Sequence, residues 1–126
     1  MAAELGREDV VDILLANNAF VNVRNKTGMT PLHLASKNGF NNMMTHLISE
    51  YGAHVDAMTL VRNCKYHFNR NFFLIFTFYL INPFQMKRTP LHLAAESGKL
   101  QVCSTLLNLK ADINALDSVS LTIVLL

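Results

Sequence analysis

The chain has 126 residues, of which 51% are apolar and 16% are charged, and its formal net charge is +2. This length allows one compact domain or a short repeat array and excludes a multidomain enzyme, while the apolar fraction excludes intrinsic disorder. The charge is too small to indicate binding to nucleic acid or to a membrane surface. Two cysteines cannot form a disulfide framework, and the acidic N-terminal segment is no signal peptide, so we expect a reducing, cytoplasmic location.

The first predicted element is a helix within residues 1–24. Apolar residues recur there at i, i+1, i+4 and i+5, which predicts one apolar helix face formed by Val10, Val11, Leu14 and Leu15. Gly6 precedes this stripe, at a point where a preceding helix would end and the chain would turn. Met1 falls midway through that preceding helix. We therefore expect residues 1–24 to be a partial unit that needs a neighbour to cover its apolar face.

Residues 25–60 predict a complete pair of helices. Thr30 is suited to cap the first helix, and Pro31 fits its first position, where the missing N–H is not needed. The apolar face of this helix would consist of Leu32, Leu34 and Ala35, and Gly39 would end it. The second helix repeats the apolar stripe of the first unit with Met43, Met44, Leu47 and Ile48.

Residues 61–85 interrupt this pattern. Val23 and Thr30 are 7 positions apart, whereas the equivalent Ala57 and Thr89 are 32 apart, so 25 residues are inserted in the loop between two units. The insertion contains eight of the eleven aromatic residues, three basic residues and no acidic residue. Without it, the remaining 101 residues carry eight basic and nine acidic groups, a net charge of −1.

Three explanations of the insertion stay open. It is a functional loop, because loops tolerate added length at small entropic cost. Alternatively it is a hairpin that dips into a membrane, although the apolar run 72–81 is well short of the ~20 residues of a spanning helix. The third explanation is a translated intron, since Val61-Arg62 and Pro83-Phe84-Gln85 can be encoded by splice-site sequences. Excision of residues 61–85 would join residue 60 to residue 86 and restore a spacing of seven positions between Ala57 and Thr89.

Residues 86–117 repeat the complete unit, and residues 118–126 match the start of a next one. The six residues Thr30–Ala35 recur as Thr89–Ala94, differing in none, and a glycine again follows four residues later, at Gly98. The apolar stripe recurs as Val102, Cys103, Leu106 and Leu107. Ile123 stands where the two complete units have proline, so we interpret residues 118–126 as a truncated start.

These features resemble the ankyrin repeat. The shared motif is Thr-Pro-Leu-His-x-Ala with its downstream glycine, and Gly6 and Gly39 are 33 residues apart, the ankyrin period. The resemblance implies an all-α solenoid of stacked helix-turn-helix units, interrupted by the 25-residue insertion. The residues that carry the structural motif are Thr30, Pro31, Leu32, His33 and Gly39, with Thr89, Pro90, Leu91, His92 and Gly98.

The resemblance also implies a non-catalytic module that binds another protein. In this family, loop tips and exposed positions of each first helix form the partner surface. Carried over by position, the loop candidates are Arg24, Lys26, Thr27, Met29, Met86, Lys87 and Arg88, and the helix candidates are Ser36, Lys37, Asn38, Ala95, Glu96 and Ser97. We expect a protein partner of unknown identity, no role for nucleic acid and no membrane contact from the repeats themselves, and we expect that neighbouring repeats are missing from this chain.

Other chemistry has little support in the sequence. His33 and His92 lie inside the repeat motif, where a structural role next to the threonine is expected, and the remaining histidines share no metal-ligand spacing with each other or with a cysteine. We therefore expect no metal, no cofactor and no enzymatic activity. The units are also similar to the long ankyrin array of TRPN-type mechanosensory channels, which gives an alternative role as part of a cytoplasmic channel tether.

Overall fold

The computed structural model of the chain describes residues 2–59 and 87–115. The described part consists of helices and connecting turns, without a strand. The helices are α1 (Glu8–Ala16), α2 (Pro31–Asn38), α3 (Asn41–Ser49), α5 (Pro90–Glu96) and α6 (Leu100–Asn108). The prediction of an all-α repeat stack is confirmed. The insertion 61–85, candidate residue Met86 and the segment 118–126 lie outside the described residues.

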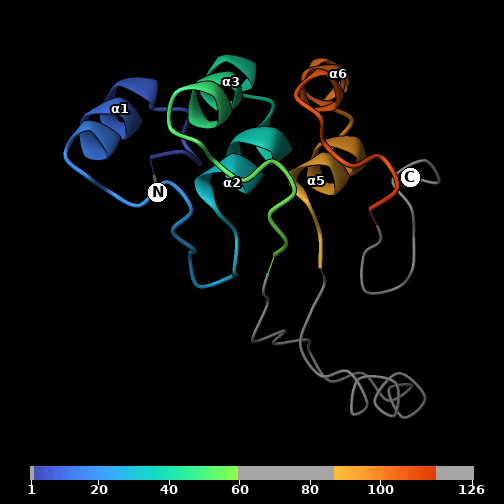
Figure 1. Ribbon diagram of the computed structural model, residues 1–126, viewed down its shortest axis with the longest axis horizontal. Helices are drawn as coiled ribbons and strands as arrows, with labels where there is room; N and C mark the ends of the chain where they lie inside the picture. The colour runs from blue at the N-terminus through green and yellow to red at the C-terminus, as the bar shows by residue number, and fades with distance from the viewer. Residues whose placement is uncertain (1, 60–86, 116–126) are drawn as a thin grey trace, which may run out of the picture.

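The helices form two layers (Figure 1). Helices α1, α3 and α6 lie in one layer, α2 and α5 lie in the other, and the described loop residues 17–30 and 50–59 reach past the second layer on the side away from the first. Helix α2 packs against α5, and α3 packs against α6, so the two complete repeats are stacked side by side. Within each repeat the two helices also contact each other. The buried members of the apolar stripes, such as Val11, Met44 and Leu106, belong to one core cluster together with Leu32 and Leu91.

The core is built from the repeated positions. Leu32, Leu91, Met44 and Leu106 are at most 1% exposed. Ala35 and Ala94 are fully buried, and a small residue at this position lets neighbouring helices approach closely. Burial of a leucine or methionine side chain contributes about 1.5–3 kcal/mol, so the stack is held together chiefly by these residues rather than by surface charges.

Helix α1 is the least enclosed of the described helices. Val11 is buried, but Ile13 is 63% and Leu14 is 51% exposed. The first helix expected before α1 is absent, because residues 2–6 form a turn in which Ala2 O accepts from the amides of Leu5 and Arg7. A lone turn of this length cannot offset the cost of helix nucleation. The first unit is therefore represented by one helix and a turn.

Candidate functional site

The two copies of the repeat motif begin their helices in the same way. Thr30 Oγ1 accepts a hydrogen bond from the His33 backbone N–H, and His33 Nδ1 in return accepts one from the Thr30 N–H at 3.1 Å. Thr89 and His92 repeat this reciprocal cap, with a Thr89 N to His92 Nδ1 distance of 3.2 Å. These bonds satisfy backbone donors that have no partner inside the helix. Both histidines thus serve to hold a helix start.

His33 also connects its repeat to the next one. Since Nδ1 accepts the Thr30 amide hydrogen, the ring hydrogen is on Nε2, which donates to the Arg88 carbonyl at 3.0 Å. The side chain is fully buried. Burial lowers the pKa of His33 from its usual 6.5 to about 4, and the nearby Arg24 charge lowers it further, while hydrogen bonds to the Arg88 and Ala57 carbonyls act in the opposite direction. The imidazole is neutral at physiological pH.

The first loop is shaped by Asn25, a residue that the sequence analysis did not single out. Its Oδ1 accepts hydrogen bonds from Thr27 N, Thr27 Oγ1 and Met29 N at 2.8–3.0 Å. Gly28 follows with φ = +73°, a conformation that glycine adopts without strain. The sequence feature that indicates this turn is the Asn-x-x-Gly spacing, because asparagine commonly organises a turn through its own side chain.

The base of the second loop copies the base of the first one. In the first loop, Asn25 N donates to Met29 O at 3.0 Å, and Met29 N donates to the Asn25 side chain. In the second, Thr59 N donates to Arg88 O at 2.9 Å, and Arg88 N donates to Thr59 Oγ1 at 3.1 Å. The residues that flank the 25-residue insertion are therefore paired as in an uninterrupted repeat.

Several candidate residues are brought together on the loop side. Arg24 Nη1 donates to Gly28 O in its own loop and to Met58 O in the second loop, which joins the two loops. Arg88 forms an ion pair with Glu96 on α5. Since Lys37 occupies on α2 the position that Glu96 occupies on α5, it belongs to the same side of the stack.

The candidate residues differ in their exposure. Arg24, Lys26, Thr27, Lys37, Lys87, Glu96 and Ser97 are exposed. Met29 is half-buried against the core, Ala95 is half-buried, and half-buried Asn38 donates its side-chain amide to Glu4 O at 3.0 Å. The expectation that Ser36 lies at the surface is wrong, because the residue is fully buried on α2, a helix that packs against both α3 and α5. We call the exposed members, together with partly exposed Arg88, the loop-side surface.

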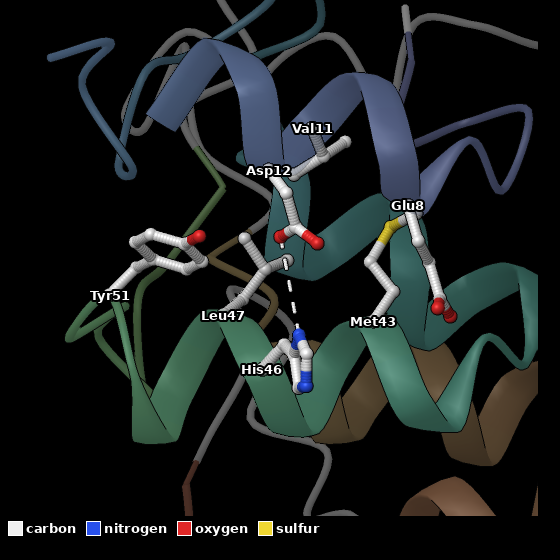
Figure 2. Close-up of a pocket in the computed structure, with 7 residues that line it drawn as sticks. All are labelled: Glu8, Val11, Asp12, Met43, His46, Leu47 and Tyr51. Carbon is white, nitrogen blue, oxygen red and sulfur yellow. Dashed lines mark ion pairs between the residues drawn. The ribbon is translucent and has the colours of Figure 1, made fainter. Parts of the chain in front are cut away.

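The opposite layer contains a shallow depression between α1 and α3 (Figure 2). Asp12 and His46 face each other across it, with a 4.0 Å separation between Oδ1 and Nδ1, and Tyr51 lies at one end. Burial, followed by the Asp12 carboxylate, raises the pKa of Tyr51. An exposed ion pair of this kind contributes little, and none of the predicted partner-binding residues lines the depression. It gives no support for a site.

The described residues contain no arrangement suited to metal binding or nucleophilic catalysis. Residues 2–59 and 87–115 include no group of three histidine, cysteine or carboxylate side chains close enough to hold a metal ion. Cys103 is half-buried against the core, and burial raises the pKa of its thiol, which disfavours the reactive thiolate. Among these same residues, no helix has the length and apolar character needed to cross a membrane.

Comparison with known families agrees with this architecture. A family model described as ankyrin repeats in three copies matches residues 1–117. The chain belongs to the ankyrin-repeat family. It is also 44% identical over 52 residues to an ankyrin repeat protein of Rickettsia bellii (strain RML369-C). The matched residues are 41% of this chain and 22% of that relative, so the chain spans about a fifth of the relative's length. Ankyrin repeats are protein-interaction modules, and the family is typically non-enzymatic.

Proposed function

We propose that this ankyrin-repeat chain is a scaffold or adaptor segment that binds another protein through its loop-side surface. The observation that carries the proposal is the hydrogen bond from Arg24 to Met58 O, which holds the first loop beside the second. Side chains on two adjacent loops can then contact one partner together. We further propose residues 1–24, 25–60 and 86–117 as the ankyrin units of this segment, with a cytoplasmic location.

The charges on the loop-side surface favour an acidic partner segment. The surface carries five cations (Arg24, Lys26, Lys37, Lys87 and Arg88) and one carboxylate, Glu96, which is already paired with Arg88. Arg24 is bonded to neutral carbonyls, so its charge is not compensated. Within the described residues, Lys26, Lys37 and Lys87 have no carboxylate partner. A partner segment with an extended backbone and carboxylate side chains would be complementary in charge to this surface.

The test compares charge reversal on and off this surface. A photo-activatable cross-linking residue at Thr27 is used to recover bound proteins from an extract of the source organism, and the recovered partner is then titrated against each variant. Lys26→Glu and Lys87→Glu should each weaken binding by about fivefold and reduce its salt dependence. Lys110→Glu, an equal charge change at an exposed site after α6, should leave binding unchanged. Equal effects of all three would refute the assignment.

The alternative role, as part of the cytoplasmic tether of a TRPN-type mechanosensory channel, makes a different prediction. It requires six membrane-spanning segments downstream of the array in the full-length gene product. A soluble domain at that place would favour the scaffold role instead. Both roles use the same repeat stack, so the stack itself does not separate them. Sequencing of the full-length transcript distinguishes them by the segments that it encodes downstream of the array.

A further inference from the structure

Thr27 lies in the turn of the first loop, next to basic side chains. Arg24 precedes it by three positions and Lys26 by one, and all three residues are exposed. Arg24 Nη1 donates to Gly28 O at 2.9 Å, so its guanidinium lies beside the residue that follows Thr27. The sequence from residue 13 to residue 49 contains no acidic residue. The Thr27 side chain is therefore an exposed hydroxyl group in a positively charged loop.

Asn25 controls access to this hydroxyl group. Its Oδ1 accepts hydrogen bonds from Thr27 Oγ1 at 2.8 Å, from Thr27 N at 3.0 Å and from Met29 N at 2.9 Å. A base on another protein can take the hydroxyl hydrogen only after the contact with Asn25 opens. Exposed loops open locally at little cost. The Asn25 contact therefore slows access to the hydroxyl group without preventing it.

Thr89 has a similar sequence context but a different environment. Thr27 and Thr89 are the two threonines that directly follow a basic residue, Lys26 and Arg88 respectively. Thr89 is fully buried, and its Oγ1 lies 2.8 Å from His92 Nδ1 in the helix cap. An enzyme that modifies hydroxyl groups cannot reach Thr89 unless the start of α5 unfolds. Of these two threonines, the structure thus exposes Thr27 alone.

We propose that Thr27 is a phosphorylation site that regulates the loop-side surface. The modifying enzyme is a protein kinase of the class that binds basic residues before its acceptor, and ATP is the phosphoryl donor. Thr27 Oγ1 forms a bond to the γ-phosphorus while the bond from that phosphorus to the bridging oxygen breaks. The hydroxyl proton passes to the carboxylate base of the kinase, and ADP leaves. The regulatory part rests on the function proposed above, whereas the site itself does not.

Phosphorylation of Thr27 would oppose the binding of an acidic partner. The loop-side surface carries five cations and one carboxylate, and a phosphothreonine adds about two negative charges, the same charge change as Lys26→Glu. The phosphate oxygens would also compete for Arg24, because a phosphate is a stronger acceptor than the neutral Gly28 and Met58 carbonyls that now hold it. The modified loop would therefore repel carboxylates that the unmodified loop attracts.

The first test maps the phosphate on the full chain. The chain is incubated with magnesium ATP and a purified kinase that requires arginine three positions before its acceptor, and mass spectrometry identifies the modified residues. We expect phosphate on Thr27, and its loss from that loop in Thr27→Val. Arg24→Gln should slow the reaction by about tenfold or more, whereas Lys110→Gln, at an exposed site after α6, should not change it. A chain without phosphate on Thr27, or with equally fast modification of Thr89, would overturn the proposal.

A variant of Asn25 tests whether the turn controls access. Asn25→Ala should raise the rate of phosphorylation of the full chain by about fivefold, because the Thr27 hydroxyl group is released. A synthetic peptide of residues 21–33 is too short to keep the turn by itself, so the same substitution should leave its rate unchanged. Equal rate changes in the chain and in the peptide would show that Asn25 acts through kinase recognition and would contradict this control of access.

The regulatory part is tested with an oligo-glutamate peptide as the probe. The phosphorylated chain and Lys26→Glu should each bind this peptide about fivefold more weakly than the unmodified chain, with a smaller salt dependence. Equal binding by the phosphorylated and unmodified chains would overturn the regulation. Absence of binding by the unmodified chain would instead refute the acidic partner proposed above, together with its regulation, while the mapped phosphate still decides whether Thr27 is the site.

Discussion

The two complete repeats carry the same six-residue motif but differ in what surrounds it. In both, threonine and histidine cap the first helix by the same reciprocal hydrogen bonds. His33 continues to a carbonyl of the next repeat, whereas His92 Nε2 has no partner among the described residues. Ser36 is fully buried, whereas its equivalent Ala95 is half-buried. Identical local sequence thus produces identical local structure, and the neighbouring repeat decides burial.

The largest expected difference concerns the outer helices. Met44 on α3 is fully buried, and its equivalent Cys103 on α6 is half-buried. Met44→Ala should lower the free energy of unfolding by about 2–5 kcal/mol, because it leaves a cavity in the core. Cys103→Ala should cost less than about 1 kcal/mol. Urea denaturation of both variants measures the difference, and similar losses would show that the last repeat is packed as tightly as the central one.

The next effect is a pH dependence specific to His33. Its pKa in the folded chain is about 4, below the usual 6.5, so the unfolded chain binds more protons between these values. The stability contributed by neutral His33 is complete above pH 6.5 and decreases as the pH falls toward 4. The gap between the two values corresponds to about 3 kcal/mol.

The measurement for this pH effect is a series of urea titrations between pH 7 and pH 4. His33→Asn, which cannot titrate, serves as the matched variant. Its stability should vary less with pH than that of the parent chain, by about 3 kcal/mol over the interval. Parallel pH curves for the two proteins would rule out His33 as the source.

A smaller difference is expected at the glycines that end α2 and precede α6. Gly39 and Gly98 have φ values of +82° and +67°, so alanine at either place should cost about 1–2 kcal/mol. A Cβ at Gly39 would also lie 3.0 Å from Lys99 Cδ, whereas a Cβ at Gly98 would meet nothing within 4 Å. Gly39→Ala should therefore be the more destabilising of the two in thermal unfolding, and the reverse order would contradict this packing.

The smallest effect is expected from removing the insertion. Joining Leu60 to Met86 shortens the loop from 32 to 7 positions and should raise stability by about 1 kcal/mol through a lower cost of loop closure. The paired backbone at Thr59 and Arg88 should persist, which hydrogen exchange of the two amides can verify. Loss of that pairing would show that the repeats depend on the insertion.

Transcript sequencing across residues 59–87 tests the intron hypothesis, since a dominant message with all 25 codons would refute it.

Much of the fold was predictable because it is local and repeated. The Thr-Pro starts, the glycine turns and the apolar stripes each depend on residues within one or two helical turns. The structure confirms helices at these places, with α1, α3 and α6 at equivalent positions in their units. The turn organised by Asn25 was also local, but its side-chain signal was overlooked.

The candidate site was less predictable because exposure depends on partners far apart in the sequence. Ser36 and Ala95 occupy the same repeat position, yet one is buried and the other half-buried. Position in the motif says nothing about whether a further repeat follows. Arg24 and Met58 are joined by a hydrogen bond across 34 positions, and no feature of either residue alone indicates it.

The sequence by itself determined the family, the helix caps and the spacing of the units, since these follow from short-range hydrogen bonds and apolar periodicity. Only the tertiary structure decided which member of each equivalent pair is enclosed. It placed His33 against the Arg88 carbonyl and buried it, which lowers its pKa, and left His92 Nε2 without a partner among the described residues. The physical reason is that burial and cross-repeat hydrogen bonds belong to the interface between units, not to either unit alone.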